Sequence, residues 1–316
     1  MSPPPKGSDA MKAVLTDARF SDPGWIFERK LDGVRCVAVR DGDAVKLWSR
    51  NDLALNGRYP EVADALEAEP CRRFAVDGEV VAFDGAQTSF ARLAARGRVP
   101  VPVFFYIFDI LWLDGDDLRA RPLRDRKALL RQTLTFASDT IRFTPHRNEH
   151  GERFFAEACR KGWEGLIAKR ADSPYAVGKR SRDWLKLKCE AGQELVIGGF
   201  TAPRGSRTDF GALLVGHYDG AVLRYAGKVG TGFDQATLAG LGARLRELRR
   251  DDPPFADPGT IRERDVTWVQ PELVAQIGFT EWTTAGRLRH PRFLGLRDDK
   301  AARDVVRERR SSSDLT

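Results

Sequence analysis

Residues 25–48, WIFERKLDGVRCVAVRDGDAVKLW, predict a β-hairpin preceded by a strand that ends at a lysine. Trp25–Phe27 and Val34–Val39 have the aromatic and β-branched composition of strands. The Asp-Gly-Asp triplet that follows is a turn signal, and Val45–Trp48 alternates apolar and polar side chains. Lys30 therefore lies between two strands, at the entrance to a tight turn through Gly33.

Further strands and helices follow on both sides of this hairpin. Strand composition recurs at Phe74–Phe83, Phe104–Leu113, Gly165–Lys169 and Trp184–Lys188. Helical patterns occupy Tyr59–Glu69, Asp125–Leu134 and Glu152–Lys161. Strands and helices do not alternate regularly, which favours an α+β fold over a doubly wound one.

The sequence changes character after Lys188. Short strands punctuated by glycine fill residues 194–229, and strand composition resumes at Val274–Trp282. One helix intervenes, with Asp234 as its expected N-cap. This pattern is typical of a small β-barrel, and the OB-fold is the barrel class that binds nucleic acid.

We therefore predict an α+β protein: a mixed or antiparallel nucleotidyltransferase domain followed by a C-terminal OB-fold β-barrel. The expected parts are an N-terminal extension over 1–19, partly disordered, a first domain over 20–190, the barrel over 191–302, and a basic, serine-rich tail over 303–316.

Composition suggests the partner. The 316 residues carry a net charge of +7, with a pI near 9.4, which suits a polyanion, although a solvated basic surface gives the same numbers. The four cysteines form no CxxC pair, so we expect neither structural zinc nor a disulfide scaffold, and a reducing cytosol. No apolar run reaches membrane-spanning length.

Lys30 is the candidate nucleophile, although a solvated loop lysine is the commoner explanation of so short a motif. A nucleophilic amine must lose a proton, so we expect cationic neighbours, desolvation or a metal to lower its pKa.

The order of the following motifs strengthens the case for Lys30. After Lys-Leu-Asp-Gly at 30–33 come Ser-Arg-Asn at 49–51, Asp-Gly-Glu at 77–79 and Phe-Asp at 108–109; Glu-Gly-Leu-Ile-Ala-Lys at 164–169 and Trp-Leu-Lys-Leu-Lys at 184–188 complete the series. This series resembles the covalent nucleotidyltransferase superfamily of ATP-dependent DNA ligases, RNA ligases and mRNA-capping enzymes. The Ser-Arg-Asn motif lacks the glycine that commonly follows it.

The resemblance implies a role for each motif residue. Lys30 matches the lysine that becomes adenylated, within a motif completed by Asp32, and Arg50 matches a ribose or phosphate contact. Glu28 matches an adenine contact and Phe108 the ring that stacks on adenine. The remaining matches are Arg35 at the nucleotide or nick, Glu79 at the ribose or metal, Glu164 at the metal, Lys186 and Lys188 at the α-phosphate, and Lys169 as their helper.

Strand geometry is compatible with the phosphate assignment. The period of two places Lys186 and Lys188 on one face of their strand and the intervening leucines on the other. Two cations on one face suit a phosphate between them, although an amphipathic strand with a solvated basic face has the same pattern.

The C-terminal part resembles the ligase module of bacterial ligase D, the end-joining ligase that works with Ku. Arg297 and Lys300 match its last motif, which contacts pyrophosphate. The basic loop at 179–182 fits a DNA phosphate contact, and His290 is expected to be structural.

This resemblance implies an ATP-dependent DNA ligase that uses Mg²⁺ or Mn²⁺ and seals nicked double-stranded DNA through a lysyl-AMP intermediate, in DNA repair or end joining. It also implies a cytoplasmic monomer, with Ku and separate polymerase or nuclease proteins as possible partners. The rival assignments are an RNA ligase, a capping guanylyltransferase, or an inactive DNA-binding protein with an OB-fold. We further expect the linker at 189–193, with Ala191-Gly192, to be a hinge that lets the barrel close over ATP and then turn to the nick.

Overall fold

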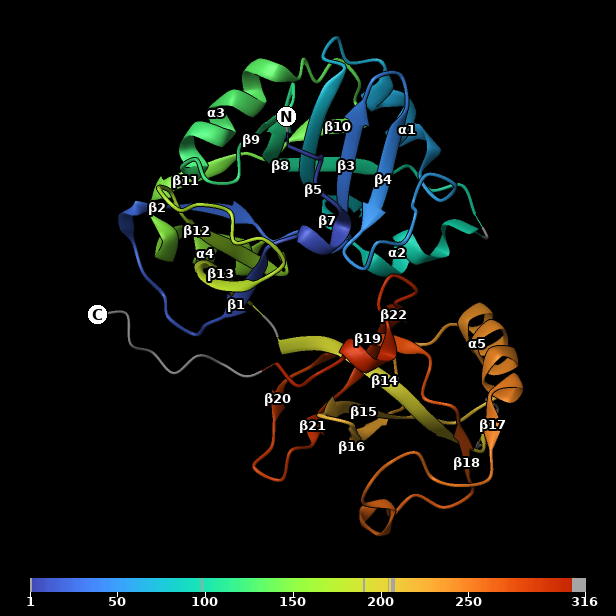
Figure 1. Ribbon diagram of the computed structural model, residues 1–316. Coiled ribbons are helices and arrows are strands. Elements are labelled where there is room, and N and C mark those ends of the chain that lie inside the picture. Colours follow the sequence, from blue (N-terminus) through green and yellow to red (C-terminus); the bar gives the residue numbers. More distant parts are fainter. Residues whose placement is uncertain (1, 98, 190, 204, 206–207, 309–316) are drawn as a thin grey trace. The chain divides into compact units, whose positions relative to one another are not determined.

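The computed structural model describes residues 2–97, 99–189, 191–203, 205 and 208–308. Its contacts divide this part of the chain into two compact units, and the boundary in the sequence falls between Cys189 and residue 190. Figure 1 shows the elements of both units, which are described separately below.

The first unit contains two sheets. One has the strand order β1-β13-β12-β2-β11, formed by Lys12–Leu15, Arg180–Lys188, Gly165–Arg170, Asp22–Arg29 and His146–Glu149. The other has the order β10-β8-β5-β3-β4, formed by Ile141–Phe143, Phe104–Leu113, Arg73–Val81, Val34–Asp41 and Val45–Ser49, with β9 (Asp116–Asp117) beside β8. A short hairpin, β6 (Phe83–Asp84) and β7 (Gln87–Thr88), completes the strands of this unit.

Helices cover these sheets because their apolar faces match the buried strand faces. Helices α1 (Pro60–Glu67), α2 (Phe90–Ala94) and α3 (Leu123–Thr133) contribute to the core of the second sheet. Helix α4 (Gly151–Arg160) packs Phe154 and Ala158 against Leu185 and Leu187 of the first sheet. The leucines of β13 are therefore buried as the alternation predicted.

The second unit is built on a curled sheet around one long strand, β14 (Ala191–Thr201), which pairs with β15, β18 and β19. Its other strands are β15 (Leu213–Asp219), β16 (Val222–Val229), β17 (Arg249–Arg250), β18 (Val266–Val269), β19 (Val274–Phe279), β20 (Glu281–Trp282), β21 (Leu288–Arg289) and β22 (Arg292–Leu296). Helix α5 (Gln235–Glu247) begins as predicted at Asp234, whose carboxylate accepts from the Thr237 amide at 2.7 Å. These features confirm the α+β class with a C-terminal domain on a curled sheet. Among the described residues no helix is both long enough and apolar enough to span a bilayer.

The structure corrects the expectation for the N-terminus. Within the expected extension at 1–19, the described residues 2–19 are not separate from the domain, because Lys12–Leu15 forms the edge strand β1 in parallel with β13. Met11 is completely buried, and the Ser2 carbonyl accepts from the Trp112 indole at 3.0 Å. This segment is thus part of the first unit.

Two further expectations near the unit boundary are wrong. Ala191 and Gly192 are not a flexible linker, since they begin β14 and pair with Phe279 and Gly278 of β19. At the other end, residues 303–308 do not all lie in a tail, because Val305 is buried and Val306 bridges to Tyr218. The expected tail at 309–316 lies outside the described residues.

A disulfide, which the cysteine spacing did not indicate, joins Cys159 at the end of α4 to Cys189 after β13, with Cα atoms 5.3 Å apart. The fold brings these positions together because the Cys189 amide donates to the Glu164 carbonyl, 3.0 Å away in the loop that follows α4. Their separation of 30 residues carries no such signal in the sequence.

Candidate active site

Lys30 lies directly after β2, where its strand leaves the first sheet. Its backbone amide donates to the Gly165 carbonyl of β12 at 2.9 Å, which fixes the start of the turn. Its Nζ lies 2.6 Å from Glu164 Oε2, and both side chains are about one-fifth exposed. The structure thus brings together the predicted nucleophile and a predicted metal-binding carboxylate.

The pKa of Lys30 is shifted upward, whereas we expected it to be lowered. Burial by itself would lower this pKa, but the carboxylates of Glu164, Asp32 and Glu79 outweigh burial and hold it above its ordinary value. All three acidic residues belong to the motifs named above, but we considered only cations, desolvation and a metal as influences on this pKa. In the protein alone, Lys30 is a protonated ammonium paired with Glu164.

Glu28, two residues before Lys30 on β2, is buried between two lysines. Its Oε1 accepts from Lys127 Nζ at 2.5 Å, and its Oε2 pairs with Lys169 Nζ at 2.7 Å. Burial would raise the pKa of Glu28, but the two ammonium groups lower it overall. The ammonium of Lys169, the assigned helper of the phosphate-binding lysines, lies against Glu28 and 4.0 Å from the Phe108 ring centroid.

Phe108 extends from β8 toward the first sheet. The ring packs edge-on against Trp184 of β13, with centroids 5.9 Å apart, and only 8% of the residue is exposed. The Lys169 ammonium and the Arg35 guanidinium, 4.7 Å from the centroid, both lie over the ring.

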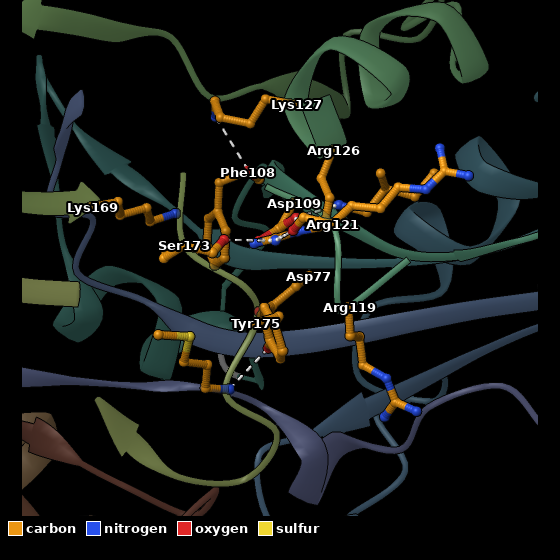
Figure 2. Close-up of polar contacts among 12 residues, drawn as sticks. Asp77, Phe108, Asp109, Arg119, Arg121, Arg126, Lys127, Lys169, Ser173 and Tyr175 are labelled. Atoms are coloured by element: carbon orange, nitrogen blue, oxygen red, sulfur yellow. Dashed lines mark hydrogen bonds and ion pairs between the residues drawn. The ribbon is translucent and has the colours of Figure 1, made fainter. Parts of the chain in front are cut away.

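Arg35 is held by a buried carboxylate that sequence reasoning did not select. Its Nε and Nη2 donate to Asp77 at 2.5 and 2.6 Å, and Nη2 also donates to the Met11 carbonyl at 3.2 Å. The Tyr175 hydroxyl donates to the same carboxylate at 2.5 Å and accepts from the Met11 amide at 2.9 Å. Figure 2 shows Tyr175 beside Asp77. In the sequence, Asp77 could have been selected as the first residue of the Asp-Gly-Glu motif.

The predicted phosphate-binding lysines lie on the same sheet as Lys30. Lys186 and Lys188 of β13 pair with Ile167 and Gly165 of β12, and Ile167 pairs in turn with Glu28. Both lysines are partly exposed, whereas the leucines beside them are buried. The shared face of this sheet therefore carries Glu28, Lys186 and Lys188.

The other predicted residues lie around the same turn and strands. The Asp32 carboxylate accepts from the Phe90 amide at 3.2 Å, so it fixes the start of α2. Glu79 of β5 pairs with Arg35 of β3 and is partly exposed. Arg50 follows β4 directly and is also partly exposed.

Arg297 and Lys300 belong to the second unit. Arg297 is buried and bonded twice to Asp299, through Nε and Nη2 at 2.8 Å each. Lys300 Nζ lies 3.2 Å from Glu194 of β14. Lys300 can therefore be replaced with less damage to its unit than Arg297, whose loss would strand a buried carboxylate.

The acidic groups of the site are spread over several elements. In the part of the chain that the structure describes, no three His, Cys, Asp or Glu side chains gather as a metal-binding group. The carboxylates of Glu164 and Glu79 nevertheless both raise the pKa of Lys30. Two carboxylates with nucleotide phosphates are the donor set that Mg²⁺ prefers, so these residues fit such an ion.

Helix α3 contributes two buried cations that the sequence analysis missed. Arg126 is bonded twice to Asp109, at 2.8 and 2.9 Å, with both side chains fully buried, and Lys127 bonds Glu28. Figure 2 shows both helix residues above Phe108 and Asp109. The available signal was periodicity, because Lys127 occupies the core position between Leu123 and Leu130.

Comparison with known proteins agrees with this arrangement. Residues 8–188 match the ATP-dependent DNA ligase domain, and residues 206–300 match the C-terminal region of ATP-dependent DNA ligases. The chain is 40% identical over 288 residues to the multifunctional non-homologous end-joining protein LigD of Mycobacterium bovis, and 38% identical over 298 residues to that of Pseudomonas aeruginosa. These matches cover 90% of the chain but only 37% and 35% of the relatives, so it spans just over a third of their length.

A solved structure of an ATP-dependent DNA ligase is similar to this chain over nearly its whole length. Mycobacterial DNA ligase D complexed with ATP and MES is 36% identical, with a TM-score of 0.69, and the match covers 95% of this chain and 99% of that one. The ordered motifs from Lys30 to Lys188, the two-sheet unit that carries them and these matches lead to one conclusion: the chain belongs to the ATP-dependent DNA ligase family.

Proposed function

We propose that this chain seals nicks with a 3′-hydroxyl and a 5′-phosphate in double-stranded DNA, using ATP and a lysyl-AMP intermediate on Lys30. The observation that carries the proposal is the position of Lys30 at the end of β2, in contact with Glu164 and on the sheet that bears Glu28, Lys186 and Lys188.

In the first step, Lys30 Nζ attacks the α-phosphorus of ATP. A nitrogen–phosphorus bond forms, the bond to the bridging oxygen of the β-phosphate breaks, and pyrophosphate leaves with that oxygen. The ammonium proton that Glu164 holds must be lost to solvent beforehand. Lys186 and Lys188 stabilise the negative charge on the α-phosphate as it develops.

The remaining motif residues bind the rest of the nucleotide. Glu28 and Phe108 receive the purine, and Arg50 and Glu79 contact the ribose side. Asp32 ties the turn that carries the nucleophile to the start of α2, because its carboxylate accepts from the Phe90 amide. Arg297 and Lys300 bind the pyrophosphate.

A divalent cation fits Glu164 and Glu79, and Mg²⁺ or Mn²⁺ is the ion that we assign. When bound there, it neutralises phosphate charge and orients the pyrophosphate leaving group. By competing for Glu164 it would also remove the strongest ion pair of Lys30.

In the second step the 5′-phosphate of the nick attacks lysyl-AMP, which releases Lys30 and leaves AMP on the DNA end. The 3′-hydroxyl then attacks that 5′-phosphorus, which forms the phosphodiester and releases AMP. Arg35, which Asp77 anchors through two hydrogen bonds, contacts the nick in this proposal. Arg180 and Arg182, which the structure has at the start of β13 and not in a loop, and Lys179 directly before them contact DNA phosphates, so binding weakens as salt rises.

We also propose a role in DNA repair by end joining in the bacterial cytoplasm, as a monomer with Ku and separate polymerase or nuclease proteins as partners. This rests on the similarity to LigD, of which the chain spans just over a third.

Sealing of a labelled nicked duplex tests the proposal. The chain with ATP and Mg²⁺ should join the strands, and GTP should not replace ATP. Transfer of GMP to the protein, with no ligation, would instead identify a capping guanylyltransferase. Efficient joining of nicked RNA but not DNA would identify an RNA ligase.

A further inference from the structure

Lys127 is a buried residue of this site to which none of the motifs assigns a role. It is 3% exposed, on the face of α3 that packs on β8. A buried ammonium is costly unless its protons are all bonded, so this lysine needs an explanation.

The contacts of Lys127 account for its three protons. Nζ donates to Glu28 Oε1 at 2.5 Å, to the Phe108 carbonyl at 3.2 Å and to the Thr144 carbonyl at 3.4 Å. An ammonium group has three donors and no acceptor. Lys127 therefore joins β2, β8 and the segment after β10, and it keeps no proton for a ligand. Figure 2 shows its bond to Phe108.

These contacts also fix the orientation of Glu28. With Oε1 held by Lys127, Oε2 is the oxygen paired with Lys169, whose ammonium lies over the Phe108 ring. A carboxylate oxygen, which only accepts hydrogen bonds, thus stands next to an ammonium, which only donates them. The ammonium lies over the ring that the proposed function assigns to base stacking, and the carboxylate oxygen is paired with it.

This pattern distinguishes purines. Adenine presents a donor at its 6-amino group beside an acceptor at N1, which complements a carboxylate beside an ammonium. Guanine and hypoxanthine present the reverse, an acceptor at O6 beside a donor at N1. Sites that fix hydrogen-bonding groups in this way discriminate strongly, because the wrong ligand leaves buried groups unpaired or opposed.

We propose that Lys127 is a positioning residue for purine selection: it fixes Glu28 so that Oε2 and the Lys169 ammonium together accept a 6-amino purine and oppose a 6-oxo purine. This inference rests on the proposed function, in which Glu28 and Phe108 receive the base. Without Lys127, Glu28 can rotate or take up a proton, and a protonated carboxyl can donate to O6.

The experiment compares self-nucleotidylation with ATP and with inosine triphosphate, under one metal concentration, in the full chain and its variants. The measured quantity is the ratio of kcat/KM for the two nucleotides. Lys127→Met should lower this ratio by about tenfold or more, mainly through a higher KM for ATP. Lys127→Arg, which keeps the charge and donors, should restore much of the ratio. Lys46→Met, at an exposed lysine on β4, is the matched control and should leave the ratio unchanged.

If Lys127 had only a structural role, its loss would lower kcat/KM for both nucleotides by the same factor. An unchanged ratio in folded Lys127→Met would therefore overturn the proposal. If that variant does not fold, Glu28→Gln decides, because its amide offers a donor where the carboxylate offers only acceptors; an unchanged ratio there overturns the proposal as well. Failure of the wild type to take up AMP would refute the proposed function. A wild type that takes up AMP and IMP equally well would refute only this inference.

Discussion

The buried pair between Asp109 and Arg126 allows a quantitative test of how the site is supported. Both side chains are fully buried, and the guanidinium is bonded twice to the carboxylate. Asp109→Asn keeps the shape of the side chain but removes its charge and one acceptor. Stranding a buried charge in this way costs about 3–5 kcal/mol of folding free energy.

A double-mutant cycle separates this pair from general damage. Arg126→Met removes the stranded charge, although it also takes a donor from the carbonyls of Arg121 and Ser173. Its cost should therefore be smaller by about 2 kcal/mol in the Asp109→Asn background than in the wild type. Asp41→Asn is the matched control, since its pair with Arg73 is exposed and should be worth less than about 1 kcal/mol.

Urea unfolding of the full chain, followed by hydrogen exchange of β8 peptides, assigns the change to the first unit. If Asp109→Asn costs less than about 1 kcal/mol, or the two single changes are simply additive, the buried pair does not stabilise this unit as argued.

Three other predictions follow from particular contacts. Glu164→Gln should raise the Mg²⁺ concentration for half-maximal self-adenylation by about tenfold or more, and chelation should abolish the reaction; an unchanged metal requirement would remove Glu164 from the metal site. Alkylation of the unfolded, unreduced protein should spare Cys159 and Cys189, and labelling of both would contradict the disulfide. Replacing both cysteines by serine should lower the free energy of unfolding by about 3 kcal/mol. Lys300→Ala should slow reaction with ATP but retain most sealing of a pre-adenylated nick, and equal losses in single-turnover assays of both would contradict a role at pyrophosphate.

Local patterns predicted the parts of this structure that depend on neighbours in sequence. Alternation along β13 separated Lys186 and Lys188 from the buried leucines, and Asp234 caps α5 as expected. Both follow from the repeat of a single strand or helix, which one segment carries by itself. The order of the motifs, through the family resemblance, selected both Lys30 and Glu164, but their contact was seen only in the structure.

Contacts between distant segments could not be predicted in this way. The carboxylates that raise the pKa of Lys30 come from separate parts of the chain, and Lys127 is 99 residues from its partner Glu28. The Cys159–Cys189 disulfide depends on how α4 meets the end of β13. Ala191-Gly192 suggested a hinge because glycine commonly marks flexible segments. The pairing of Gly192 with β19, more than 80 residues later, cannot be seen in the local sequence.

The central claim is that Lys30 carries AMP, and intact mass spectrometry after incubation with ATP and Mg²⁺ tests it most directly. The account predicts one added adenylate on the wild type and on Lys46→Ala, with peptide mapping to Lys30, and none on Lys30→Ala. It also predicts that Lys30→Ala still seals a nick that already bears 5′-AMP, because Lys30 acts only in the earlier steps. An adenylate on Lys30→Ala, or one that maps to another residue of the wild type, would contradict the account.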